Sequence, residues 1–380
     1  MRKRVVAALG LIGVAVALGS FGIWVGSLPA GATASPAPVP AAETAAMLEA
    51  LKPPKRERPV IAVIGMNDAT ETTDYLMPAG ILRRADVAEV QLVATEEGPV
   101  KLYPALSVEP DTTIAAFDAA YPQGADYVIV PAMSRDDDPA VMAWLQEQAG
   151  KGSIVIGVCA GAKVLAAAGL LEERRGTTNW FFLKELLQEN TTVTYVADRR
   201  FVVDKGVATT TGITASMPMA ITLIEAIAGR AKADAVAAAI GLEQWDAGHD
   251  SNAFRLTRPF ATAVMGNVLQ FWQHEELDLA LQPEFDAVSL ALVADAWSRT
   301  YRSRAVTSAP SDAALADRDG ILILPDRVAT DYADDRSITA PGPIKPAVAL
   351  DQALVGIAAR YGDATANVVA MQLEYPGSRP

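Results

Sequence analysis

The single cysteine of the chain stands in a segment that could activate a nucleophile. Cys159 lies between Gly157 and Gly161, after a β-branched apolar run and before an alanine- and leucine-rich run that is typical of a helix. This order is that of a nucleophile elbow, a sharp strand-to-helix turn whose glycines let the backbone pass closely. Because a helix would begin just behind the sulfur, we expect its dipole to favour the thiolate and lower the pKa of Cys159.

A packing role is the alternative interpretation of Cys159. A lone cysteine in an apolar stretch usually behaves as a small buried hydrophobe. Since the chain has one cysteine, an intramolecular disulfide does not explain it. The strand–glycine–helix context favours the functional interpretation.

Alternating strands and helices are expected to position this turn. The predicted strands are residues 60–64, 90–94, 127–130 and 154–156, and the predicted helices between them are residues 73–84 and 138–150. Such alternation is typical of an α/β fold, a parallel sheet covered by helices on both faces. Functional side chains in such a sheet lie beyond the carboxyl ends of the strands, where Cys159 and the loop containing Asp74 would both be placed.

The composition argues against several function classes. The 380 residues include 32 Lys and Arg against 45 Asp and Glu, for a net charge of -13, and 51% are hydrophobic. An acidic chain without basic clusters argues against nucleic-acid binding. Two histidines and one cysteine are too few for a typical zinc site, and we predict neither a metal nor a cofactor.

The first 58 residues are expected to lie outside the folded part. Residues 1–29 combine a basic start with an uncharged run over residues 5–28, about 24 residues where about 20 suffice to span a bilayer. This predicts a single-pass membrane anchor with the main domain extracytoplasmic. The small residues at 32–34 leave open a cleaved signal and a secreted protein. Residues 30–58, rich in Ala and Pro and with a basic patch, are interpreted as a linker.

The C-terminal third is expected to form a smaller α/β extension over residues 257–380. A helix is predicted for residues 254–281 and another for 348–361, with strands at 287–292, 320–325 and 367–371. The run ending in Pro325 echoes the run ending in Pro131, so this region is interpreted as a degenerate half-repeat without a nucleophile. An unrelated extension that packs on the first domain is the alternative.

Several motifs carry a resemblance to a known family. The segment GVCAG is followed by AAAGLLEERRGTTNW, and residues 198–229 read DRRFVVDKGVATTTGITASMPMAITLIEAIAG. Together they resemble the ThiJ/PfpI family of class I glutamine-amidotransferase-like domains, closest to the branch found in isonitrile hydratases and AraC-type regulators. The resemblance covers residues 59–256 and implies a flavodoxin-like parallel-sheet sandwich.

The resemblance also implies site residues. In this family an acid four residues before a proline hydrogen-bonds the nucleophilic cysteine, and Asp74 stands four residues before Pro78. A solvated loop or N-cap carboxylate is the alternative for Asp74. The backbone amides of Ala160 and Ala132 match the positions that hold a developing negative charge.

Three departures from the family pattern put catalysis in doubt. Asn179 stands where many members have a histidine, Ala160 where hydratase-like members have threonine, and Ala132 where a glycine is common. Asn179 would line the pocket without acting as a base. His249 is the remaining candidate, with Asp246 and Asp250 able to orient it, although a solvated loop residue is the simpler interpretation.

The resemblance implies addition of water to, or hydrolysis of, a small carbon–nitrogen or carbonyl compound, with Cys159 as nucleophile and Asp74 as acid/base partner. A non-catalytic sensor or binding module with a degenerate site is the second hypothesis, and a structural role at the cell envelope is the third. The expected partners are a small-molecule ligand and, through the N-terminal helix, a membrane. The sequence leaves a homo-oligomer open.

Overall fold

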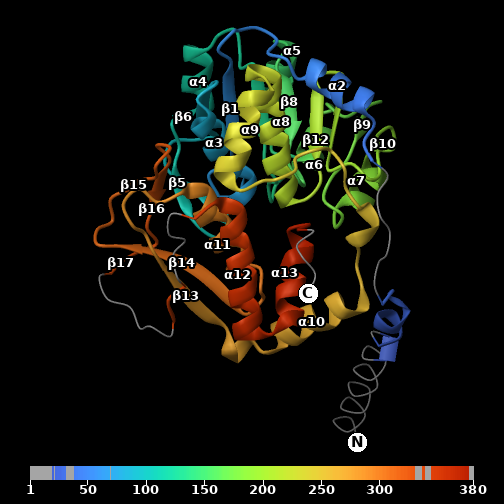
Figure 1. Cartoon of the computed structure of the whole chain (residues 1–380), viewed down its shortest axis with the longest axis vertical. Helices are drawn as coiled ribbons and strands as arrows, with labels where there is room; N and C mark the ends of the chain where they lie inside the picture. The colour runs from blue at the N-terminus through green and yellow to red at the C-terminus, as the bar shows by residue number, and fades with distance from the viewer. Residues whose placement is uncertain are drawn as a thin grey trace, which may run out of the picture.

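A seven-stranded sheet lies at the centre of the first part of the chain (Figure 1). The computed structural model describes residues 19–20, 22–30, 38–68, 70–329, 336–338 and 344–375. Within them the sheet has the order β11-β12-β8-β7-β1-β3-β6, and only β11 runs antiparallel to its neighbour. Its strands are β1 (Val60–Gly65), β3 (Glu89–Ala94), β6 (Thr112–Thr113), β7 (Tyr127–Val130), β8 (Ile154–Gly157), β11 (Phe201–Asp204) and β12 (Val207–Thr210). The predicted α/β fold with a parallel core is confirmed.

The apolar strands are buried on both faces, which explains why their sequences do not alternate with polar residues. In β1, Ile61 and Val63 point into one core, whereas Ala62 and Ile64 point into the other. The first core is covered by α2 (Ala41–Ala50), α3 (Thr72–Ala85), α8 (Ser216–Ala228) and α9 (Arg230–Ile240). The second is covered by α4 (Ile114–Ala120), α5 (Pro139–Gly150), α6 (Gly161–Ala167) and α7 (Leu183–Glu189).

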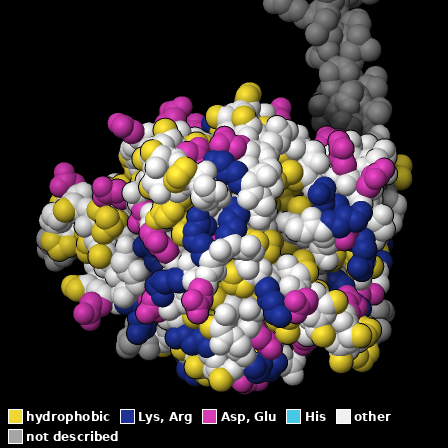
Figure 2. Space-filling view, turned by 90° about the horizontal axis from the view of Figure 1, so that it is seen from above, with side chains coloured by type: hydrophobic (Ala, Val, Ile, Leu, Met, Phe, Trp, Pro, Cys, Tyr) yellow, Lys and Arg dark blue, Asp and Glu magenta, His cyan; other side chains and the backbone are white. Residues whose placement is uncertain are grey.

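Part of the predicted linker is docked on this domain. Residues 41–50 form α2, and Met47 and Leu51 are buried in the first core. The basic residues that follow are paired rather than free: Arg56 binds Asp126 at 2.6 Å, and the Nζ of Lys55 donates to the carbonyl of Ala125 at 2.6 Å. On the face seen in Figure 2, basic and acidic side chains are likewise intermixed.

The predicted membrane anchor was wrong. No helix in the described part of the chain is both long enough and apolar enough to cross a bilayer. Residues 1–18 of the predicted anchor lie outside the described residues, as do residues 31–37, which include the alternative cleavage site.

The C-terminal region differs from the predicted half-repeat. Residues 287–292 belong to a helix, not a strand, because Asp286 caps an apolar run that continues to Ser298. A short apolar run fits either element, so its length decides. Residues 367–371 are also helical, and the predicted helix over 254–281 gives way to a strand. The elements are α10 (Arg258–Leu269), β13 (Glu275–Ala280), α11 (Ala287–Ser298), β14 (Ser303–Ala309), β17 (Arg327–Val328), α12 (Pro346–Tyr361) and α13 (Asp363–Gln372).

This region packs closely on the first domain (Figure 1). The strand predicted near residues 320–325 is β16 (Leu322–Leu324), which pairs with β5 (Ser107–Glu109) of the first domain. Helix α11 crosses α3 at Gly80, where a β-carbon would lie 2.6 Å from a methyl group of Val288. At the edge of this crossing, Arg84 binds Asp286 at 2.9 Å and Asp319 at 2.6 Å. The two parts therefore share one core.

Gly80→Ala tests this crossing. We expect it to lower the free energy of unfolding by about 1–3 kcal/mol, because the added methyl group overpacks the interface with Val288. Adding Val288→Ala should offset part of the loss. A β-carbon added at Gly266 of α10 would have no atom within 4 Å, so Gly266→Ala should instead stabilise by about 0.5–1 kcal/mol. Denaturant unfolding measures all four proteins, and a stabilising Gly80→Ala would contradict the close crossing.

Candidate active site

Cys159 occupies a strained turn between β8 and α6. Its φ of 55° lies in the left-handed region that non-glycine residues rarely adopt. The strain is held in place because its amide donates to Thr210 Oγ1 at 3.0 Å and its carbonyl accepts from Thr178 Oγ1 at 2.9 Å. Gly161 is required because a β-carbon there would lie 2.0 Å from the carbonyl oxygen of Val130. This geometry is that of a nucleophile elbow.

Asp74 lies in the first turn of α3 and is fully buried. Its Oδ2 accepts a hydrogen bond from the amide of Ala132 at 3.1 Å, whereas Oδ1 has no partner among the described residues. The hydrogen bond expected between Asp74 and Cys159 is therefore not formed in this structure. Burial, together with the charge of Glu71, raises the pKa of Asp74 well above its usual range. A carboxyl group in this state keeps its proton and can donate it from Oδ1.

The two predicted amides differ in availability. The Ala132 amide is already bound to Asp74, so it positions the acid rather than facing a substrate. The Ala160 amide donates no hydrogen bond to any described residue, and Ala160 lines the same cavity as Cys159. Among the described amides, Ala160 is therefore the better placed to stabilise negative charge.

The expectation of a lowered thiol pKa was wrong. Burial raises the pKa of Cys159, and the carboxyl groups of Asp74, Glu71 and Glu374 raise it further. Arg299 acts in the opposite direction. Helix α6 has seven residues, and the dipole of so short a helix does not offset removal of the sulfur from water. Since Asp74 and Cys159 cannot both carry charge cheaply at close range, the pair retains a proton at neutral pH.

A cavity of about 550 Å³ opens onto Cys159. Ala132, Ala160 and Asn179 line it, so the structure brings these predicted site residues together. The Oδ1 of Asn179 accepts from the amide of Phe181 at 3.0 Å and thereby fixes its own loop. The aromatic and large apolar residues of the wall are Tyr103, Met133, Trp180, Phe181, Phe182, Ile213, Phe260, Val264 and Tyr301. The last three belong to the C-terminal region.

Sequence reasoning missed an ionic cluster beside the cysteine. Arg299 donates from Nη2 to Glu71 Oε1 and from Nε to Asp295 Oδ2, both at 2.7 Å. Glu71 also accepts from the amide of Asp74 at 2.6 Å, as the N-cap of α3. The local signal for Glu71 was its place three residues before Asp74, a helix-capping spacing. Arg299 had no such signal, since it is 228 residues from Glu71 in the sequence.

His249 does not join Cys159 in this cavity. Its Nε2 lies 3.3 Å from Glu374 Oε2 without forming a hydrogen bond, and its ring stacks on Phe254 with the ring centres 5.3 Å apart. Among the described contacts of His249, neither Asp246 nor Asp250 orients the ring. It lines a neighbouring cavity of about 510 Å³ that shares Trp180 and Phe181 with the first. No group of His, Cys, Asp and Glu within the described ranges could hold a metal ion.

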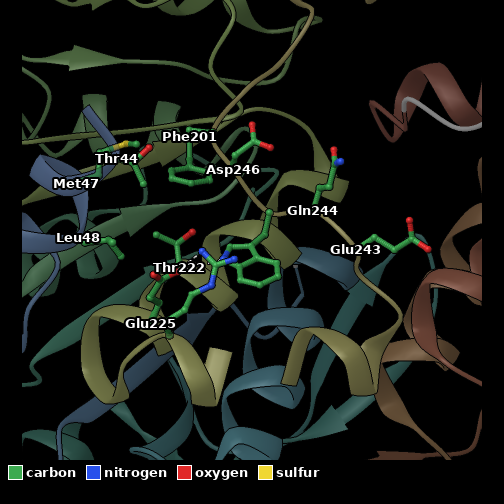
Figure 3. Close-up of a pocket in the computed structure, with 12 residues that line it drawn as sticks. Thr44, Met47, Leu48, Phe201, Thr222, Glu225, Glu243, Gln244 and Asp246 are labelled. Atoms are coloured by element: carbon green, nitrogen blue, oxygen red, sulfur yellow. Dashed lines mark hydrogen bonds and ion pairs between the residues drawn. The ribbon is translucent and has the colours of Figure 1, made fainter. Parts of the chain in front are cut away.

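A further pocket of about 320 Å³ lies between α2 and α8 and shares no lining residue with either cavity (Figure 3). Glu225 accepts from Trp245 Nε1 at 3.3 Å, and the guanidinium of Arg230 stacks 4.3 Å from the centre of the Trp245 ring. Because Glu225, Arg230 and Trp245 are engaged with one another, these groups offer less to a ligand than the Cys159 cavity does.

Substitutions at the elbow should reverse the usual order of alanine and glycine. Both Cys159→Ala and Cys159→Gly remove the sulfur, but alanine keeps the β-carbon that strains a φ of 55°. We expect the glycine variant to be more stable by about 1 kcal/mol. Ala160 has an ordinary φ of -74°, so Ala160→Gly should destabilise by about 0.5–1 kcal/mol. Thermal or denaturant unfolding decides, and a more stable Cys159→Ala would argue against the strained turn.

Asp295 should make stability depend on pH. Burial and the nearby Glu71 carboxylate raise its pKa to about 7, from about 4 in the unfolded chain. The folded state then holds the proton of Asp295 more tightly than the unfolded chain does. The contribution of this proton to the free energy of unfolding is therefore complete below about pH 4 and is lost as pH rises towards about 7. Relative to wild type, Asp295→Asn should gain on the order of 3 kcal/mol between these pH values and change little above pH 8. Parallel stability curves for the two proteins would contradict this assignment.

Comparisons with known proteins agree with this fold. The model of the DJ-1/PfpI family matches residues 60–226. An isonitrile hydratase from Pseudomonas putida is 32% identical over 160 residues, covering 41% of this chain and 67% of that protein. The HTH-type transcriptional regulator CdhR from Pseudomonas aeruginosa is 29% identical over 171 residues, covering 44% of this chain and 47% of that protein.

Among solved structures, Drosophila melanogaster DJ-1beta superimposes with a TM-score of 0.45 at 24% identity, over 49% of this chain and 100% of that chain. The family match falls on the part of the chain that holds the large sheet, Asp74 and Cys159. The chain therefore belongs to the DJ-1/PfpI family.

Proposed function

We propose that this protein is a cysteine-dependent hydratase or hydrolase that acts on a small, neutral carbon–nitrogen or carbonyl compound. The observation that carries the proposal is the placement of Cys159, in a left-handed turn at the cavity, together with a buried acid, Asp74, whose Oδ1 has no hydrogen-bond partner among the described residues. The similarity to an isonitrile hydratase supports the carbon–nitrogen class.

The proposed chemistry uses the proton that Asp74 and Cys159 retain. The sulfur of Cys159 bonds to the electrophilic carbon of the substrate, and the displaced π-electron pair moves to the neighbouring atom. In an isonitrile the terminal carbon keeps its lone pair, so the thiol proton passes by way of Asp74 to that carbon and a thioimidate forms; in a carbonyl compound the proton passes to the oxygen. When water then adds to the carbon of the thioimidate, one proton of the water goes to the nitrogen. The other returns to the sulfur as the carbon–sulfur bond breaks and the formamide is released. The Ala160 amide stabilises the negative charge that develops between these steps.

The charges around the cavity favour a neutral substrate. Arg299 is matched by Glu71 at 2.7 Å, and Lys163 is matched by Glu185 at 2.6 Å. Neither cation of the cavity wall is left unpaired for an anionic group. The aromatic and aliphatic wall suits an apolar body, with the reactive carbon placed at Cys159.

A non-catalytic binding module is the second candidate. Two observations favour it: burial raises the pKa of the thiol, and Asn179 replaces the histidine that the family resemblance would have supplied as a base. The cavity would then hold a ligand without forming a bond to sulfur.

Turnover of benzyl isonitrile to N-benzylformamide separates the two candidates. We expect conversion by the wild type and none by Cys159→Ala. Asp74→Asn, which keeps the size of the side chain, should lower kcat at least about 100-fold because it removes the proton carrier. Asp278 is also a buried carboxyl, bound to Ser308 at 3.0 Å outside this cavity, so Asp278→Asn should retain activity.

Binding of benzyl isonitrile with equal affinity to wild type and Cys159→Ala, without any product, would favour the binding module. Turnover that survives Cys159→Ala would contradict both the nucleophile and the mechanism.

A further inference from the structure

Arg299 links the C-terminal region to the cysteine site. It follows the last residue of α11, lines the cavity onto which Cys159 opens, and its side chain is 16% exposed. Its guanidinium holds two carboxylates at 2.7 Å, Glu71 and Asp295. Its own carbonyl accepts from Gln372 Nε2 at 3.0 Å, so α13 fixes the backbone from which the side chain extends.

Glu71 connects Arg299 to Asp74 through its two carboxylate oxygens. One carboxylate oxygen of Glu71, Oε1, faces Arg299, whereas the other, Oε2, accepts from the Asp74 amide at 2.6 Å and from Thr73 Oγ1 at 2.9 Å. A carboxylate that accepts three hydrogen bonds and donates none is arranged as an ionised acceptor. The position of Asp74 at the start of α3 therefore depends on a carboxylate whose charge is balanced from the C-terminal region.

We propose that Arg299 is a positioning residue for the Cys159 site: it holds the Glu71 carboxylate in place, and through it Asp74, and it supplies the positive charge that balances the carboxyl groups around the thiol. The proposal rests on the proposed role of Cys159 as a nucleophile. The other described donors to the Glu71 carboxylate, Thr73 and the Asp74 amide, carry no positive charge. Among these contacts, the balancing charge therefore comes from Arg299 and not from the ThiJ/PfpI-like domain of residues 59–256.

The charges that face the thiol come from several elements. Asp74 and Glu71 lie at the start of α3, Glu374 follows α13, and Arg299 follows α11. The three carboxyl groups raise the pKa of Cys159, and Arg299 lowers it. Asp295, one turn before Arg299, also binds the guanidinium. Lys163 of α6 lines the cavity but is paired with Asp136 and Glu185. Loss of Arg299 would leave the thiol facing uncompensated carboxylates.

The rate of alkylation of Cys159 by iodoacetamide, measured against pH, tests the proposal without any substrate. Arg299→Met should move the midpoint of the profile upward and lower the rate at pH 7 by about tenfold for each unit of the shift. Glu71→Gln removes a negative charge and should move the midpoint downward. The double variant Arg299→Met/Glu71→Gln should return towards the wild-type midpoint, which a purely structural role of Arg299 would not produce.

Two further variants serve as controls. Arg299→Lys keeps the charge and should stay near the wild-type midpoint. Arg84 is as buried as Arg299 and also joins α3 to the C-terminal region through two carboxylates, but it does not line the cavity. Arg84→Met should therefore leave the alkylation midpoint unchanged even if it lowers stability.

The proposal would be overturned if Arg299→Met left the midpoint unchanged, or if it raised the rate at every pH without shifting the midpoint. It would also be overturned if Arg84→Met shifted the midpoint as much as Arg299→Met does. If Arg299→Met does not fold, Glu71→Gln decides, since a wild-type midpoint there would show that Glu71 and the thiol are not coupled. Absence of benzyl isonitrile turnover combined with the expected midpoint shifts would count against the proposed function alone.

Discussion

Burial of carboxyl groups beside a thiol is the constraint on which this site depends. Asp74 and Asp295 are fully buried, Glu71 and Cys159 nearly so, and electrostatic interactions link all four. Such groups cannot all be ionised in a poorly hydrated environment without compensation. The structure meets this constraint in two ways, by raising the pKa values of Asp74 and Asp295 and by inserting the guanidinium of Arg299 between Glu71 and Asp295.

This constraint gives the C-terminal region a physical reason to be part of the domain. The guanidinium reaches Glu71 only because α11 packs against α3, and that packing requires the missing side chain of Gly80. The same helix pair is joined by Arg84 through Asp286 and Asp319, and β16 extends the sheet that contains β5. The region also supplies Phe260, Val264 and Tyr301 to the cavity wall. Its packing and its contribution to the site are thus consequences of one interface.

Features that depend on residues close together in the sequence could be predicted, whereas those that depend on residues far apart could not. The strands of the large sheet and the turn at Cys159 rest on patterns within a few residues, and the structure has them as expected. Asp74, expected in a loop, lies instead in the first turn of α3. The strand predicted at residues 287–292 failed because a short apolar run fits a buried helix equally well. The role of Arg299 could not be predicted from the sequence, because its partner Glu71 lies 228 residues away.

The thiol pKa shows why a correct local pattern can still mislead about chemistry. A strand-to-helix turn suggests a preformed thiolate, yet the sulfur here is buried and faces carboxyl groups, so its neutral form is favoured. A neutral thiol is a weak nucleophile until its proton has an acceptor. Asp74, whose carboxyl group keeps its own proton, can act as a relay: it gives that proton to the substrate from its buried Oδ1 and takes up the thiol proton in exchange. A site built in this way suits reactions in which the proton moves together with the formation of the sulfur–carbon bond, which is what addition to a neutral carbon–nitrogen bond requires.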